Sequence, residues 1–266
     1  MDHKTIDRIV WWIPFKQLRK DIRSVLNDIN YIKNVNERTY KMLSKENIIY
    51  HSQLEDMDFY FYDSLLSCTA EVVSKEVDLY NLNTINFKEG DVVIDIGANV
   101  GIISIYLAKK YPFLKIYSFE PVKQNYENLI KNIKINNIPD GIITAENIAI
   151  TKDRRNIDII TPLDNTGGSS FSIDRHLNAV NSNINIAVKS MTFDDIFNKY
   201  NIDKCKLLKI DCEGAEYEIL YNANENNLKK CCNMRGEFHG SESEQKKLYE
   251  YCLKYINNIE YQEAIC

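Results

Sequence analysis

Residues that could bind a nucleotide cofactor lie near the middle of the chain. Gly97 and Gly101 form a glycine turn with Asn99 between them, and Asp95 precedes this turn. Glycine adopts positive φ readily and has no Cβ to block a ligand, and a helix that starts after Gly101 offers free amide groups to a carboxylate. Glu120 follows 19 positions later (120 − 101), where an acid can accept hydrogen bonds from ribose hydroxyls. The pairing of turn and acid predicts a nucleotide site.

The spacing of the two glycines distinguishes two kinds of cofactor. A dinucleotide turn has the pattern G-x-G-x-x-G, whose central glycine lets the backbone approach a pyrophosphate. Here Gly97 and Gly101 are four positions apart with Asn99 between them, so the central glycine is missing. An NAD-dependent oxidoreductase is therefore less favoured than an enzyme that uses S-adenosylmethionine, whose methionine part carries a carboxylate.

A second group of residues could act on the acceptor in a methyl transfer. Transfer to a hydroxyl requires alignment of the reacting atoms and a base that removes the proton. We expect the catalytic residues among Asp211, Glu213, Glu237 and His239. Asp211 could hold the cofactor, the acceptor or a metal, and His239 could equally be a packed residue. Glu216 is expected to be a capping group at a helix N-terminus. The spacing of the carboxylates prescribes no metal site, and none is predicted.

An α/β framework must bring these residues to one rim. From Phe87 onward, short apolar runs alternate with longer amphipathic stretches, which indicates strands covered by helices. We expect strands at residues 91–96, 114–119, 142–150, 185–189, 206–210, 234–239 and 259–265, and helices at residues 102–111, 122–133, 193–200, 215–223 and 242–255. The pattern predicts an α/β, Rossmann-like fold with a mostly parallel sheet and helices on both faces. Such sheets bind ligands beyond the carboxyl ends of their strands.

Seven stretches of the sequence, taken in order, resemble the FkbM family of methyltransferases. They are VVIDIGANVGIISIYLA, YSFEPVKQNYENLIKNIKINN, NIAI, GGSSF, KSMTFDDI, LLKIDCEGAEYEIL and GEFH, and they cover roughly residues 88–240. The resemblance implies a class I methyltransferase fold, S-adenosylmethionine as cofactor, and O-methylation of sugars, glycolipids or other natural products. A full class I sheet ends in a β-hairpin, of which the stretch before Cys266 supplies the first strand.

The same resemblance implies roles for individual residues. It implies cofactor contacts from Asp95, Gly97, Asn99, Gly101 and Glu120, with Asn147 near the adenine and Asp211 facing the methyl group. It places Gly168, Ser169 and Ser170 beside the acceptor entrance. A Gly-Gly-Ser-Ser string also suits a plain flexible turn, so both interpretations of these three residues stay open.

Residues 1–85 differ from the rest of the chain and are expected to form a helical N-terminal extension of a methyltransferase domain at residues 86–266. The extension is polar and contains only Pro14 and no glycine. Its stretch IVWWIPFKQLRKDIR resembles the leader of many bacterial surface-glycan enzymes, notably glycosyltransferases. Residues 9–23 could rest at a membrane interface, but packing on the catalytic domain or on a partner subunit is favoured because Pro14 interrupts a continuous amphipathic helix.

Composition limits the partners and the location that we expect. The net charge is -5 with Lys and Arg scattered among acids, which disfavours nucleic acid as a partner. Seven cysteines without a CxxC pair fit a reducing environment, so a cytoplasmic location is expected. The longest apolar run, residues 9–15, is shorter than the roughly 20 residues that span a bilayer, and no signal-peptide pattern precedes it. A homo-oligomer is compatible with these data.

Three functions are compatible with the sequence. The favoured one is an S-adenosylmethionine-dependent O-methyltransferase that acts on a sugar hydroxyl of a bacterial surface glycan or its precursor. The second is a methyltransferase for a small-molecule natural product. The third is a non-catalytic nucleotide-binding scaffold in a glycan-assembly complex, and the presence of Asp95, Gly97, Gly101, Glu120 and Asp211 argues against it.

Overall fold

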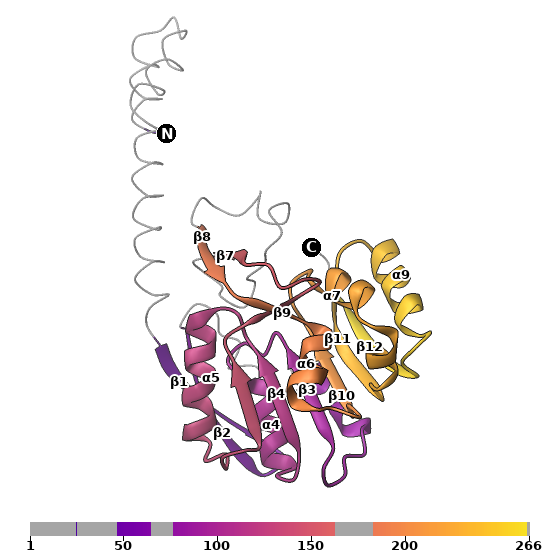
Figure 1. Cartoon of the computed structure of the whole chain (residues 1–266). Coiled ribbons are helices and arrows are strands. Elements are labelled where there is room, and N and C mark those ends of the chain that lie inside the picture. Colours follow the sequence, from indigo (N-terminus) through magenta and orange to yellow (C-terminus); the bar gives the residue numbers. More distant parts are fainter. Residues whose placement is uncertain (1–24, 26–46, 65–76, 163–182, 265–266) are drawn as a thin grey trace, which may run out of the picture.

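A computed structural model describes residues 25, 47–64, 77–162 and 183–264 of the chain. The centre of the molecule is a six-stranded parallel sheet (Figure 1). From one edge to the other it contains β12 (Asn258–Ala264), β11 (Asn233–His239), β10 (Leu207–Ile210), β3 (Val92–Ile96), β4 (Lys115–Phe119) and β5 (Ile143–Glu146). The chain winds outward from β3 to β5 in one direction and from β10 to β12 in the other. The switch point therefore lies between β3 and β10.

Helices cover both faces of this sheet, as the sequence predicted. One face carries α4 (Ile102–Lys110) and α5 (Lys123–Ile135), and the other carries α6 (Phe193–Tyr200), α7 (Glu216–Asn222), the short α8 (Glu225–Lys229) and α9 (Glu242–Cys252). Alternate residues of a strand point to opposite faces. Val93 and Leu207 accordingly belong to the core beneath α4, whereas Ile94 and Leu208 belong to the core beneath α6, α7 and α9. The fold is an α/β, Rossmann-like class I fold.

Two helices on the second face begin at capping boxes. Thr192 accepts a hydrogen bond from the backbone N–H of Asp195 before α6, and Ser241 accepts one from Glu244 before α9. In both cases the side chain of the acid accepts a hydrogen bond from the backbone N–H of the capping residue. Each pair satisfies two amide groups that a helix start leaves unbonded. The predicted start of α6 at residue 193 is confirmed for this reason.

Residues 47–64 form a β-hairpin, so the prediction of a helical extension is wrong for this segment. β1 (Asn47–Leu54) and β2 (Met57–Ser64) pair in antiparallel register across the two-residue loop Glu55–Asp56. Phe59 and Phe61 are fully buried and Tyr60 is exposed, which is the alternation of a strand with one buried face. Residues 1–24, 26–46 and 65–76 lie outside the described residues, including the predicted contact segment 9–23. The proposed domain boundary at residue 85 stays a prediction.

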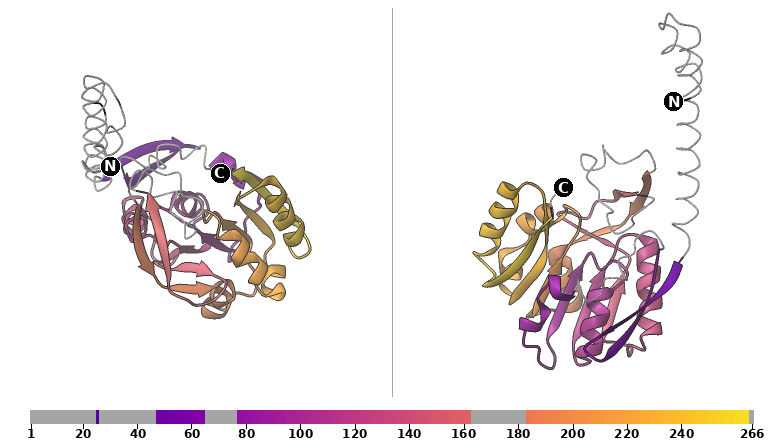
Figure 2. Two further views of the ribbon diagram at one scale, coloured as in Figure 1. Left: turned by 90° about the horizontal axis from the view of Figure 1, so that it is seen from above. Right: turned by 180° about the vertical axis from the view of Figure 1, so that it is seen from behind.

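Two asparagines of α5 hold the hairpin against the helix, and β2 lies alongside α5 in the two views of Figure 2. Asn132 accepts from the N–H of Tyr62 at 2.6 Å and donates to its backbone oxygen at 3.0 Å. Asn136 makes the same pair with Tyr60, at 3.0 and 2.6 Å. A four-residue step on a helix and a two-residue step on a strand both advance about 6–7 Å, so the two amides match the edge of β2.

Two short ladders lie outside the central sheet. β6 (Ala149–Thr151) pairs in parallel with β9 (Ser190–Thr192), and β7 (Ile157–Pro162) pairs in antiparallel with β8 (Asn183–Val188). The single strand predicted at residues 142–150 is therefore wrong, because the chain leaves the sheet after Glu146 and begins a new pairing at Ala149. β7 and β8 lie above the sheet in Figure 1. Among the helices of the described residues, none combines the length and the apolar character needed to cross a membrane.

Candidate active site

The turn after β3 places three left-handed residues at the carboxyl edge of the sheet. Gly97, Asn99 and Gly101 have φ values of 79°, 50° and 91°, a region that glycine and asparagine tolerate best. A Cβ on Gly97 would lie 1.8 Å from the backbone oxygen of Asp211, and a Cβ on Gly101 would lie 2.2 Å from Leu129 Cδ1. Packing of the chain itself therefore requires both glycines. Gly97 lets the ends of β3 and β10 meet, and Gly101 lets α4 pack on α5.

Glu120 ends the second strand of the site and is tied to the glycine turn. Its Oε2 accepts from the N–H of Asn99 and its Oε1 from the N–H of Val122, both at 2.8 Å. The residue is 4% exposed, and it lines the cavity described below. Burial raises the pKa of Glu120 to about 7, although both backbone hydrogen bonds and the charge of Lys209 lower it. The acid therefore changes its charge near neutral pH, with lone pairs left to accept from ribose hydroxyls.

Two of the predicted cofactor residues support the site from behind. Asp95 is fully buried, with Oδ2 accepting from Ser104 Oγ at 2.6 Å and Oδ1 lying 3.4 Å from Lys209 Nζ. Asn147 donates from Nδ2 to both backbone oxygens of the turn at residues 120–121, at 2.8 and 2.9 Å. Among the described residues, the cavity wall includes neither of them. Direct contact of Asp95 or Asn147 with a cofactor stays a prediction.

A cavity that is partly open to solvent lies beyond the ends of β3, β4 and β10. Part of its wall is polar and comes from Gly97, Asn99, Glu120, Asp211 and Glu213. Another part is apolar and includes Phe119, Ile148, Ile150, Ile157 and Ile159. S-adenosylmethionine is divided in the same way, into polar amino-acid and ribose parts and a flat adenine ring. The lining of the cavity therefore fits this cofactor.

The four predicted catalytic residues lie together beside this cavity. His239 ends β11, and its Nε2 lies 3.3 Å from Glu213 Oε2 and 3.9 Å from Glu237 Oε2. Its Nδ1 lies 3.1 Å from Oε1 of Glu216, a fully buried residue of α7. Asp211 completes the group, and both Asp211 and Glu213 line the cavity. The cavity and this cluster therefore share two carboxylates.

His239 carries a positive charge at neutral pH. Burial by itself lowers the pKa of His239, but the hydrogen bond to Glu216 and the charges of Glu216, Glu213 and Asp211 raise it to about 9. An imidazolium donates from both nitrogens and has no lone pair for a proton. At pH 7 the general base is therefore to be sought among the carboxylates, and His239 acts as a hydrogen-bond donor.

Three members of the cluster could also hold a metal ion. Asp211, Glu216 and His239 each offer one ligand atom, and these atoms lie within 4.8 Å of one another. An imidazole with two carboxylates is a ligand set that suits zinc or iron better than magnesium. A metal ion would have to displace the proton of His239 and its contact with Glu216. Burial also raises the pKa of the Cys212 thiol, next in the chain to Asp211, so this thiol stays protonated.

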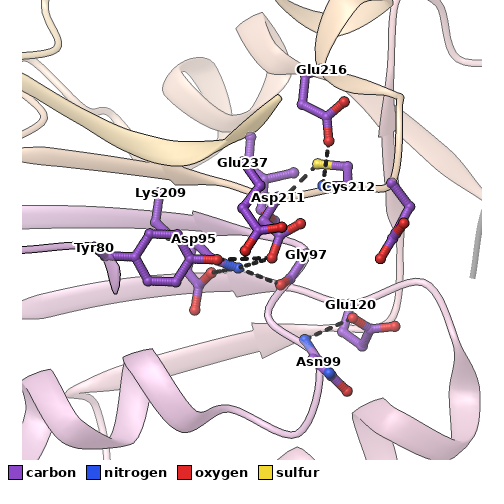
Figure 3. A network of polar contacts seen from close by, with 12 residues as sticks. Tyr80, Asp95, Gly97, Asn99, Glu120, Lys209, Asp211, Cys212, Glu216 and Glu237 are labelled. Atoms are coloured by element: carbon purple, nitrogen blue, oxygen red, sulfur yellow. Dashed lines mark hydrogen bonds and ion pairs between the residues drawn. The ribbon is translucent and has the colours of Figure 1, made fainter. Parts of the chain in front are cut away.

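Sequence reasoning missed Tyr80 and Lys209, which organise the site, and expected Glu216 to act only as a helix cap (Figure 3). Tyr80 donates from its hydroxyl to Asp211 Oδ2 at 2.9 Å, and Lys209 donates from Nζ to the backbone oxygen of Gly97 at 2.7 Å. Glu216 accepts from the N–H of Cys212 at 2.7 Å in addition to its contact with His239. A lysine inside the apolar strand LLKI was a usable signal for Lys209. Tyr80 lies 131 positions from Asp211, and no sequence pattern connects them.

The residues predicted at the acceptor entrance, Gly168, Ser169 and Ser170, lie outside the described residues. They belong to the stretch that connects β7 to β8. Ile157 and Ile159 of β7 line the cavity, so this stretch follows directly from a strand at the cavity wall. A role of these three residues in acceptor binding stays a prediction.

The winding of the sheet and the cavity at its switch point fit a class I methyltransferase. Residues 95–263 match the family described as "Methyltransferase FkbM domain". The match covers more than half of the chain, and the chain belongs to this family. S-adenosylmethionine is the cofactor that membership implies.

Two curated relatives and one solved structure are similar to this chain. "Methyltransferase sdnD" of Sordaria araneosa is 24% identical over 199 residues, which are 65% of this chain and 76% of that protein. "Methyltransferase 1" of Beauveria bassiana is 22% identical over 174 residues, or 57% of this chain and 69% of that protein. The crystal structure of Methyltransferase FkbM from Methylobacillus flagellatus is 16% identical, with a TM-score of 0.43 over 66% of this chain and 40% of the crystallised chain. This chain thus spans less than half of the length of that crystallised chain.

Proposed function

We propose that this protein transfers a methyl group from S-adenosylmethionine to a hydroxyl of a sugar, in a glycan or a glycan precursor. The observation that carries the proposal is that Asp211 and Glu213 line the same cavity as Gly97, Asn99 and Glu120. The acids that could take a hydroxyl proton therefore lie in one space with the residues that suit the cofactor. The sugar is our extension from the family resemblance, and the names of the two relatives specify no acceptor.

Different residues of the site have different roles in the proposed methyl transfer. When bound, S-adenosylmethionine supplies an electrophilic methyl group. Asn99 and Glu120 would hold the ribose, and the apolar wall would enclose the adenine ring. Asp211 and Glu213 bind the acceptor hydroxyl, and one of the two carboxylates accepts its proton. His239 donates to Glu213 as an imidazolium and offsets part of the repulsion among the neighbouring carboxylates.

Binding of the cofactor is the first test of this proposal. We expect titration calorimetry with S-adenosylmethionine to give a 1:1 complex with the purified protein. Absence of binding at millimolar cofactor would overturn the enzymatic proposal. Cofactor binding without methyl transfer to any acceptor would instead favour a non-catalytic nucleotide-binding scaffold.

The acceptor class is the second test. Purified protein and S-adenosylmethionine are incubated with three panels: simple sugars and nucleotide sugars, oligosaccharides, and hydroxylated small molecules without a sugar. We expect mass spectrometry to find the gain of one CH₂ group on a sugar-containing acceptor, and Asp211→Asn to remove it. Methylation of the third panel alone would contradict the sugar and favour the natural-product alternative.

Finer points of the functional proposal rest on the sequence alone. A bacterial surface glycan as the acceptor, a cytoplasmic location, a homo-oligomer and a contact through residues 9–23 all stay predictions. The two curated relatives come from Sordaria araneosa and Beauveria bassiana, which are fungi, so they add no support for a bacterial glycan.

A further inference from the structure

Tyr80 reaches the site from a segment that precedes the region matching the family, which begins at residue 95. The tyrosine is 2% exposed, and with Val77, Leu82, Ile85 and Phe87 it packs into the core on the α4 face of the sheet. This burial fixes the position of the ring and leaves its hydroxyl group at the carboxyl edge, where Asp211 follows β10. The segment is therefore part of the framework that supports the site.

Both chain neighbours of Tyr80 are bonded to the edge strand β12. The backbone oxygen of Leu79 accepts from Gln262 Nε2 at 3.2 Å, and Asn81 Nδ2 donates to Glu260 Oε2 at 2.8 Å. Asn81 also adopts a left-handed conformation, with φ at 46°, which turns the chain directly after the tyrosine. These contacts hold the backbone on both sides of Tyr80, so the direction of its side chain is set by several independent interactions.

The hydroxyl of Tyr80 and the ammonium of Lys209 act on the same oxygen of Asp211. Tyr80 donates to Oδ2 at 2.9 Å, and Lys209 Nζ lies 3.9 Å from Oδ2 (Figure 3). Lys209 also contacts the ring of Tyr80, with Nζ 5.5 Å from the ring centroid. Among the described residues both contacts use Oδ2, so Oδ1 of this cavity-lining carboxylate can contact a ligand. Without the Tyr80 hydroxyl, only the longer contact with Lys209 would act on Oδ2, and the Asp211 carboxylate could rotate.

We propose that Tyr80 is a positioning residue of the methyl-transfer site, whose hydroxyl holds the Asp211 carboxylate in the orientation that faces the sulfonium and methyl group of the cofactor. The proposal rests on the function proposed above, because it takes the cavity to be the S-adenosylmethionine site. It extends that site to a residue that lies outside the family match.

A binding experiment tests this without knowledge of the acceptor. S-adenosylhomocysteine lacks the methyl group and the positive charge of S-adenosylmethionine but is otherwise alike. Its dissociation constant, divided by that of S-adenosylmethionine, reports how well a carboxylate stabilises the sulfonium. We expect Tyr80→Phe to lower this ratio by about 3- to 10-fold, the size expected for one side-chain hydrogen bond. Asp211→Asn should lower the ratio at least as much, and adding Tyr80→Phe to it should change nothing further.

Tyr106→Phe is the matched control. Tyr106 is also fully buried in the same core, and its hydroxyl bonds Asn83 and Lys110 at a distance from the cavity. We expect this variant to keep the wild-type ratio, and thermal melting to show that the Phe variants are folded. A ratio in Tyr80→Phe that equals the ratio in Tyr106→Phe overturns the proposal, as does a ratio unaffected by Asp211→Asn. Failure of the wild-type protein to bind either compound would instead contradict the proposed function itself.

Discussion

The Nδ1 atom of His239 lies 3.1 Å from Oε1 of Glu216, and Glu216 is fully buried. The same carboxylate oxygen accepts from the N–H of Cys212 at 2.7 Å. Glu216 therefore links the end of β11 to the loop after β10. Glu216 is thus a buried acid with a positive partner beside it, because His239 is protonated at neutral pH.

Replacement of Glu216 should change how stability depends on pH. The pKa of His239 is raised from 6.5 to about 9, so the stabilisation is fully present below pH 6.5 and is lost as pH rises through 9. At about 1.4 kcal/mol per pKa unit, the full effect is about 3 kcal/mol. We expect Glu216→Gln to lose most of this pH-dependent part, as measured by urea unfolding at pH 6.5, 8 and 9.5. Glu218→Gln is the control, because Glu218 lies on the same helix but pairs with Arg155, which does not titrate in this range. If the free energy of unfolding depends on pH equally in the two variants, the pairing of Glu216 with His239 is contradicted.

Glu120 should make cofactor affinity depend on pH. Burial raises the pKa of Glu120 from 4.5 to about 7, so the ionised acceptor for ribose hydroxyls is present above pH 7 and is lost below it. We expect the dissociation constant of S-adenosylmethionine to increase as pH falls from 8 to 6. Glu120→Gln should bind S-adenosylmethionine at least about tenfold more weakly at pH 8, and its affinity should no longer depend on pH. Glu146→Gln, which alters the acid at the end of β5, should keep both the affinity and the pH profile of the wild type. If the affinity of the wild-type protein does not change over this pH range, the proposed role of Glu120 in ribose binding is wrong.

A pair of glycine substitutions separates backbone strain from steric overlap. Gly90 and Gly97 both have positive φ, at 81° and 79°. A Cβ on Gly90 would have no heavy atom within 4 Å among the described residues, whereas a Cβ on Gly97 would collide with the backbone of Asp211. We expect Gly90→Ala to cost about 1 kcal/mol of the free energy of unfolding, from the left-handed backbone alone. Gly97→Ala should cost more than about 3 kcal/mol, because β3 and β10 must separate. Similar melting temperatures for the two variants would show that the turn is not packed as described.

Methyl transfer should survive removal of divalent cations. At pH 7 the proton on His239 can offset the charge of Glu216 without a metal ion. We expect dialysis against EDTA to leave the rate of methylation within about twofold of the untreated rate. The measurement uses the acceptor identified by mass spectrometry, with added Mg²⁺, Mn²⁺ and Zn²⁺ as separate arms. Loss of activity that one of these ions restores would assign the cluster of Asp211, Glu216 and His239 as a metal site instead.

Local patterns explain why most of the central sheet could be predicted from the sequence. The strand before Gly97 and the helix at residues 193–200 were predicted because their apolar periodicity and end signals lie within a few residues. The hairpin was missed because its turn, Glu55–Asp56, reaches positive φ of 51° and 62° without a glycine or asparagine. Such a turn lacks the usual sequence marks of a hairpin.

The site was predicted in so far as its residues end strands. Asp211 and Glu120 each follow an apolar run and His239 ends a predicted strand, so the parallel sheet alone brings them to one rim. Tyr80 contributes through packing of a distant segment, and its contact depends on the whole core on that face. Lys209 depends on the same packing, since only the folded site supplies acceptors for a charge within a buried strand.

The paired amides of Asn132 and Asn136 determine whether β2 can pair with a strand of another chain. They occupy the backbone groups of Tyr60 and Tyr62 on the edge that faces away from β1. A strand bonded along both edges offers no template for a further strand, so this edge is closed to intermolecular pairing and aggregation. A slip of β2 by one residue would also turn these groups away from α5 and move Phe59 out of the core. The hydrogen bonds from α5 thus fix the register of the hairpin in addition to side-chain burial.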